Sequence, residues 1–153
     1  MRQHNRDVSD ALTGRPGLAW WYWLPVVAYA GLIFYLSSLS EPEVYVPSVL
    51  AELGDKVFHA MEYGLLGALC YRAFRHGANA WAARYAWHLA IIAAAVYGVT
   101  DEVHQAFVPL READVRDLLM DTIGAAIGAT VWRWTVKSYP RLSFTPYHRK
   151  PHV

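Results

Sequence analysis

The chain has 153 residues, which is enough for one domain of ordinary size. With 55% hydrophobic and 14% aromatic residues it is too apolar for a disordered polypeptide, and a net charge of +1 excludes a nucleic-acid binder that works by bulk electrostatics. Its single cysteine, Cys70, excludes both an internal disulfide framework and a cysteine-cluster metal site.

The first predicted element is a membrane-spanning helix over residues 18–39. This stretch contains no charged residue, and a helix of about 20 residues is long enough to cross a bilayer. Pro25 lies inside it, where neighbouring helices or a local kink can accommodate a proline. No small-residue cleavage pattern follows the stretch, so we expect it to remain part of the protein.

Three further spans are predicted, at about residues 53–74, 84–108 and 115–136. Their interiors contain the apolar runs GLLGALCY, AIIAAAVYG and TIGAAIGATVW, although each span also contains ionisable residues. The predicted fold class is therefore an all-α integral membrane protein with a four-helix bundle. Residues 1–17 are expected to form an N-terminal cytoplasmic segment, residues 18–137 the membrane domain, and residues 138–153 a basic cytoplasmic tail.

The basic residues predict the orientation of these spans. Eleven of the fourteen lysines and arginines fall on one side, and eleven of the thirteen acidic residues fall on the other. Short cytoplasmic segments carry an excess of Lys and Arg, so both termini are expected in the cytoplasm. All seven tryptophans fall at the same predicted inner ends, as an interfacial belt requires. The expected localisation is the plasma membrane, with several passes.

Polar residues recur at helical spacing in the outer halves of the last three predicted spans. They are Asp55, Lys56, His59, Glu62 and Tyr63, then Asp101, Glu102, His104, Gln105 and Arg111, then Arg116, Asp117 and Asp121. A rotation of 100° per residue places Asp55, His59 and Glu62 on one face of the second span and Asp101 and Gln105 on one face of the third. Asp117 and Asp121 share a face of the fourth. Because an uncompensated carboxylate in a bilayer is costly, these faces are expected to point into the bundle and not towards lipid.

Two glycines continue the acidic face of the fourth predicted span. Gly124 and Gly128 form a G-x-x-x-G pattern on the same side as Asp117 and Asp121. Such a pattern lets a second helix approach closely. The partner helix can belong to the same chain or to a second copy, and a homo-oligomer through Gly124 and Gly128 is one predicted possibility.

Two strings of the sequence resemble the signature blocks of the VanZ-like family of membrane proteins. They are DKVFHAMEYGLLG and DEVHQAFVPLREADVRDLLMDTIGAAIG. The matching positions are Asp55, Lys56, His59, Tyr63, Leu66 and Gly67, then Asp101, Glu102, Gln105, Pro109, Arg111, Asp117, Gly124 and Gly128. Asp121 departs from the pattern, since many family members carry Asn there. The resemblance implies a small helical membrane protein, and one family member is associated with low-level resistance to the glycopeptide teicoplanin.

Three interpretations of the polar residues remain open. They can be a buried network that fixes helix register. They can instead line an outward-facing pocket, with Asp101, Glu102 and His59 as catalytic candidates. The substrate-binding candidates are Asp55, Lys56, Tyr63, Gln105, Arg111, Asp117 and Asp121. A divalent cation on oxygens of Asp101, Glu102, Asp117 and Asp121 is the third interpretation. No zinc-binding spacing such as HExxH is present, so no metal site is predicted, and the sequence leaves any cofactor unknown.

The leading functional hypothesis is a membrane protein that binds or modifies cell-envelope or lipid-headgroup material. Its expected partner is membrane lipid or a lipid-linked cell-wall precursor, and no nucleic-acid partner is expected. A rival is an intramembrane hydrolase or transferase that uses Asp101 or Glu102 as base and Arg111 as clamp. Arg111 suits anion or phosphate recognition, and its structural alternative is a salt bridge to Asp101 or Glu102. A proton-coupled carrier or a purely structural role completes the alternatives, although no inverted repeat is visible.

Overall fold

A computed structural model describes residues 16–40, 54–111 and 113–138, and every regular element in these ranges is a helix. The helices are α2 (Pro16–Ser37), α4 (Asp55–His76), α5 (Ala80–Arg84), α6 (Ala86–Gln105) and α7 (Val115–Ser138). The predicted all-α fold class is confirmed for the described part of the chain. The predicted N-terminal segment and basic tail lie almost wholly outside the described residues, and the predicted domain boundaries stay a prediction.

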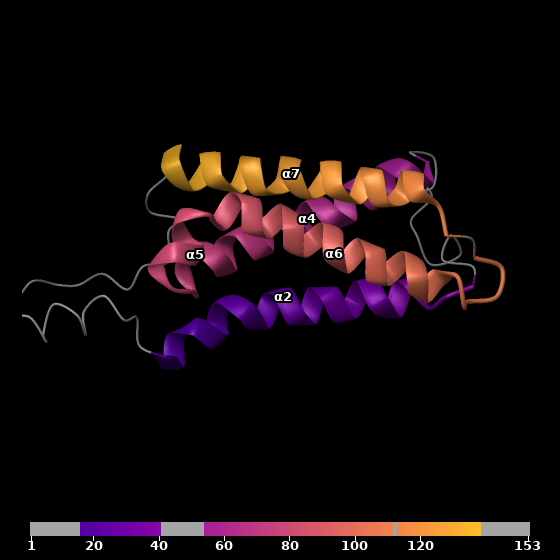
Figure 1. Ribbon diagram of the computed structural model, residues 1–153, viewed down its shortest axis with the longest axis horizontal. Coiled ribbons are helices and arrows are strands. Elements are labelled where there is room, and N and C mark those ends of the chain that lie inside the picture. The colour runs from indigo at the N-terminus through magenta and orange to yellow at the C-terminus, as the bar shows by residue number, and fades with distance from the viewer. Residues whose placement is uncertain (1–15, 41–53, 112, 139–153) are drawn as a thin grey trace, which may run out of the picture.

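The four long helices lie side by side and alternate in direction along the chain (Figure 1). α4 packs most extensively against α7 and also contacts α6, while α2 packs mainly against α4. α2 begins and α7 ends at one end of the bundle, which we call the terminal end. α6 ends and α7 begins at the opposite end, which we call the α6–α7 end (Figure 1).

Close packing of α4 against α7 depends on small residues. A Cβ at Gly124 would overlap the carbonyl oxygen of Ala60, and one at Gly128 would overlap the carbonyl oxygen of Gly64. The close helix approach predicted from the two glycines of α7 is therefore confirmed. The approaching helix is α4 of the same chain, and a homo-oligomer through these glycines stays a prediction.

Small residues also form the interior on the α6 side, and tyrosines join α2 to the bundle. Ala90 and Ala94 of α6 are fully buried. The hydroxyl of Tyr97 donates a hydrogen bond of 2.5 Å to the carbonyl oxygen of Ala30, and that of Tyr29 donates one of 3.3 Å to the carbonyl oxygen of Glu62. Backbone acceptors on α2 and α4 thus fix α2 against its neighbours.

The third predicted span is shorter than the sequence suggested. A helix over about residues 84–108 was expected, and α6 covers residues 86–105 of it. The short α5 precedes it and was not predicted. The side chain of Asn79 accepts a 2.9 Å hydrogen bond from the backbone N–H of Ala82, which starts α5 as an N-cap. A turn with Leu110 at a positive φ of 65° then leads towards α7.

Large apolar side chains are exposed on all four long helices. Examples are Val27 and Phe34 on α2, Met61 and Leu65 on α4, Ile92 and Val96 on α6, and Ile123 and Ile127 on α7. By length and composition, one helix among the described residues, Ala19–Ser37, is apolar enough to cross a membrane. α4, α6 and α7 carry charged residues: their acids lie towards the α6–α7 end, whereas Arg75 of α4 and Lys137 of α7 lie in the last turns, at the terminal end.

Candidate functional site

Four acidic side chains are buried at the α6–α7 end. Asp101 and Glu102 come from α6, and Asp117 and Asp121 come from α7; we call these four residues the acidic cluster. Each is less than a tenth exposed, and Asp121 is completely buried. The prediction that the acids of α6 and α7 point into the bundle is confirmed. Carboxylates in such a place need hydrogen-bond donors or positive charge.

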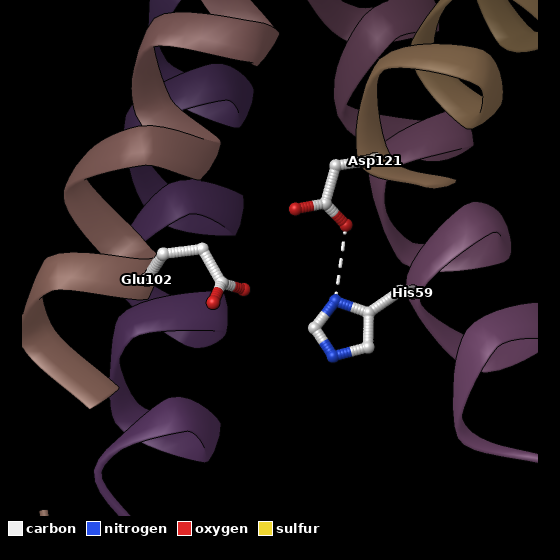
Figure 2. Close-up of side chains that lie close together, drawn as sticks. All are labelled: His59, Glu102 and Asp121. Atoms are coloured by element: carbon white, nitrogen blue, oxygen red, sulfur yellow. Dashed lines mark hydrogen bonds and ion pairs between the residues drawn. The ribbon is translucent and has the colours of Figure 1, made fainter. Parts of the chain in front are cut away.

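His59 of α4 contacts the acidic cluster directly. Its Nδ1 lies 3.0 Å from Oδ1 of Asp121, and both side chains are buried. The carboxylate of Glu102 points from α6 towards this pair (Figure 2). One ligand atom from each of these three residues lies within 4.8 Å of the others. These three side chains form a group that could hold a metal ion. The cation interpretation of the sequence used Asp101, Glu102, Asp117 and Asp121 and did not include His59.

Asp101 is held by two neutral donors. Oδ2 of Asp101 accepts a hydrogen bond of 3.1 Å from Nε2 of Gln105, one helical turn further along α6. The hydroxyl of Tyr63, which is completely buried on α4, donates to the same oxygen at 3.4 Å. The shared face of Asp101 and Gln105 was predicted from their spacing, and the structure brings them together.

Lys56 of α4 lies between two acids near the start of α7. Its Nζ donates to Oδ2 of Asp114 at 2.9 Å and also forms a salt bridge with Asp117. Asp114 caps α7, because its Oδ1 accepts a 2.8 Å hydrogen bond from the backbone N–H of Arg116. This hydrogen bond and the one from Lys56 lower the pKa of Asp114 below its ordinary value.

Asp114 was not among the residues singled out from the sequence. Its backbone N–H donates a 2.8 Å hydrogen bond to Oε2 of Glu102, so it also joins the α6–α7 connection to the acidic cluster. An aspartate directly before a helical apolar run is a recognisable N-cap signal, and this signal could have identified Asp114. The contact with Glu102 has no counterpart in local sequence.

Several polar atoms of the acidic cluster and one of Arg111 are buried without a hydrogen-bond partner among the described residues. They are Oδ1 of Asp101, Oε1 of Glu102, Oδ2 of Asp121 and Nε of Arg111. A buried polar group left without a partner costs about 1 to 3 kcal/mol, and more when it is charged. The described side chains therefore do not satisfy this site by themselves.

Residues 20–136 of the chain match the VanZ/LLP1 family. The chain belongs to this family. The resemblance predicted from the two sequence blocks is confirmed, and both blocks lie at the α6–α7 end or in the helices that lead from it. No curated protein and no solved structure matches the chain. Family membership and the single long apolar helix agree with an association with the membrane.

The predicted places of two VanZ/LLP1 block residues are not confirmed: Arg111 lacks the contact considered for it, and Asp55 is not tested. No ion pair joins Arg111 to Asp101 or Glu102, all three of which the structure describes, so the predicted salt bridge is wrong. Arg111 is one of several charged residues that act electrostatically on Glu62 of α4. The side chain of Asp55 lies outside what the structure describes.

Proposed function

We propose that this VanZ/LLP1 protein crosses the membrane with all four long helices and has both termini in the cytoplasm. The exposed apolar side chains on α2, α4, α6 and α7 support this, because a soluble bundle would place such residues inside. The interior contains many alanines and several buried polar side chains beside larger apolar ones such as Ile33 and Leu66. Tryptophans at the terminal end fit an interfacial belt, and the exposed ones are Trp20, Trp21, Trp81 and Trp134.

In this orientation the acidic cluster opens towards the outer leaflet, and its proposed role is to bind the polar headgroup of a lipid or of a lipid-linked cell-envelope precursor. The observation that carries this proposal is the set of buried polar atoms without partners on Asp101, Glu102, Asp121 and Arg111. A network that served only helix register would satisfy its own members, because each buried polar atom without a partner lowers stability.

The chemistry of these atoms describes the ligand. Carboxylate oxygens accept from hydroxyl and ammonium groups, whereas a guanidinium nitrogen donates to phosphate or carboxylate. A molecule that carries both kinds of group, such as a phosphate-linked sugar or amine headgroup, complements Glu102 and Arg111 together. Binding such material at the cell surface is a route to the reduced glycopeptide susceptibility associated with a member of this family.

The test combines folding and phenotype. We expect Glu102→Gln, Arg111→Gln and the double variant to insert and fold, since each replacement is uncharged and close in size. All three should fail to lower teicoplanin susceptibility in a host that the wild-type protein protects. Gln at either position cannot supply a full charge to the headgroup. A matched control is Arg116→Gln, which removes one exposed positive charge near the same end.

The result that would contradict the proposal is a folded double variant that protects the host as well as the wild type does. Melting temperatures in detergent establish that each variant is folded. A loss of protection that follows only from loss of folded protein would likewise assign these residues to a structural role.

A hydrolase or transferase is the second candidate function. The observation that favours it is the close pair of His59 and Asp121 beside Glu102, because a histidine oriented by a carboxylate is a common general base. Incubation of the purified protein with headgroup-labelled lipid and envelope precursors would detect a released or transferred headgroup by mass spectrometry. Turnover that His59→Gln abolishes would establish the enzyme, and binding without any product would exclude it for those substrates.

A further inference from the structure

We propose that His59, Glu102 and Asp121 bind a divalent transition-metal ion of the zinc class. This inference concerns the ion alone and does not rest on the proposed headgroup function. The three residues come from α4, α6 and α7, so an ion at this position would join three of the four long helices.

The geometry gives three donors that converge on one position. Their ligand atoms lie within 4.8 Å of one another, and Figure 2 shows the carboxylates of Glu102 and Asp121 and the ring of His59 turned towards a common centre. Ligand atoms around tetrahedral zinc are about 3.3 Å apart, given bonds of about 2.0 to 2.1 Å. The ligand atoms therefore have to come closer together by about an ångström, and the flexible side chain of Glu102 can move by this distance.

An independent observation points to a ligand at the same place. Oε1 of Glu102 and Oδ2 of Asp121 are buried and have no hydrogen-bond partner among the described residues. Glu102 is 8% exposed and Asp121 is completely buried. Their other oxygens are already engaged by the backbone N–H of Asp114 and by His59. A cation between the two carboxylates would use the remaining oxygens.

The charge balance favours a cation over a neutral ligand. The acidic cluster holds four carboxylates. Among the described residues Lys56 pairs with Asp117 and Asp114, and Asp121 pairs with His59, which is charged only when protonated. Two carboxylates this close repel each other in a buried site. A divalent ion removes the repulsion, because it offsets both charges.

The ligand types select the class of ion. One imidazole nitrogen with two carboxylate oxygens suits zinc and other first-row divalent ions, whereas calcium and magnesium prefer oxygen ligands alone. Three protein ligands leave a coordination position open for water or for an oxygen of a bound molecule, as in catalytic zinc sites.

The experiment measures metal binding by the full-length protein in detergent without any lipid substrate. After loading with Zn²⁺ and passage over a desalting column, metal analysis should find about one zinc per chain. Zinc should also raise the melting temperature. Glu102→Gln and Asp121→Asn should each weaken binding by about tenfold or more. Asp117→Asn, which removes a buried acid from the same helix outside the trio, should leave zinc binding unchanged.

Two results would overturn the proposal. One is folded wild-type protein that retains no zinc and shows no thermal shift, and the other is folded Glu102→Gln that binds zinc as tightly as Asp117→Asn does. Should the variants not fold, the Co²⁺ complex of the wild type decides the question. Its visible absorption should show nitrogen and oxygen ligation in four- or five-fold coordination, and a spectrum identical to hydrated Co²⁺ would refute the site.

Discussion

Oε2 of Glu102 accepts a hydrogen bond of 2.8 Å from the backbone N–H of Asp114. Through this contact the last turn of α6 holds the residue that caps α7. The side chain of Asp114 also accepts a hydrogen bond from Lys56 of α4, so one residue connects three helices at the α6–α7 end. The acidic cluster and the polypeptide that covers it are therefore one structural unit.

Asp114→Asn tests the charge in this connection. Asparagine is also a good N-cap, so the variant keeps the cap of α7 but loses the ion pair with Lys56. Hydrogen bonds from Arg116 and Lys56 lower the pKa of Asp114 below its ordinary value of 3.8, so the charged form stabilises the folded state above that pH. We expect the variant to melt at a lower temperature at neutral pH.

The difference between wild type and Asp114→Asn should shrink in acid. Stability from a lowered pKa is present above the unfolded-state value of 3.8 and is lost as the pH falls through the lower folded-state value. Other acids titrate in both proteins, so the difference isolates Asp114. Melting temperatures in detergent from about pH 7 down to about pH 3 measure it, and a constant difference over that range would contradict the ion-pair assignment.

Lys56→Gln should destabilise the bundle through the buried Asp117. The salt bridge of Lys56 reaches Asp117, which is 5% exposed, so the variant leaves a buried carboxylate with less compensation. Because Lys56 itself is partly exposed, we expect a loss of about 1 to 3 kcal/mol in the free energy of unfolding. The double variant Lys56→Gln with Asp117→Asn should recover part of that loss, and additive losses in chemical denaturation would show that the two side chains do not interact.

Gly128→Ala tests the contact between α4 and α7. A Cβ there would overlap the carbonyl oxygen of Gly64, which is backbone and cannot rotate away. The helices must separate, and we expect a loss of about 1 to 3 kcal/mol in the free energy of unfolding. Gly31→Ala on α2 is the matched control, because nothing lies within 4 Å of its added Cβ. Equal melting temperatures for the two variants would show that the described approach of α4 to α7 is wrong.

The sequence predicted the helices well where the determining features are local. Apolar runs placed α2, α4 and α7 within a few residues of their observed bounds. α6 also lies within a few residues of the predicted span from about Arg84 to Val108. The short α5, which Asn79 caps, was not predicted, because its 5 residues are too few to show a helical hydrophobic period.

The acidic cluster was also predictable only in its local features. Residues on one helix, such as Asp101 and Gln105, were placed on a common face by spacing alone. Contacts between helices were not predictable, because they depend on how far each helix is rotated and shifted against its neighbour. The contact of His59 on α4 with Asp121 on α7 is an example, because no spacing within one helix contains it.

Orientation in the membrane is the remaining prediction, and exposed positions at the two ends of the bundle test it. Phe107 is 83% exposed beside the α6–α7 end, and Asn79 is exposed at the terminal end. The native Cys70 is buried and can be replaced by Ala to remove background labelling. With both termini in the cytoplasm, Phe107→Cys should react with an impermeant maleimide added to intact cells, whereas Asn79→Cys should react only after the cells are permeabilised. The basic residues favour this outcome because most of those that the structure describes lie towards the terminal end, on the predicted cytoplasmic side (Figure 1). Labelling of Asn79→Cys but not Phe107→Cys in intact cells would show the opposite orientation, with the acidic cluster facing the cytoplasm. The proposed binding of outer-leaflet headgroups would then be wrong, even if every contact within the bundle were correct.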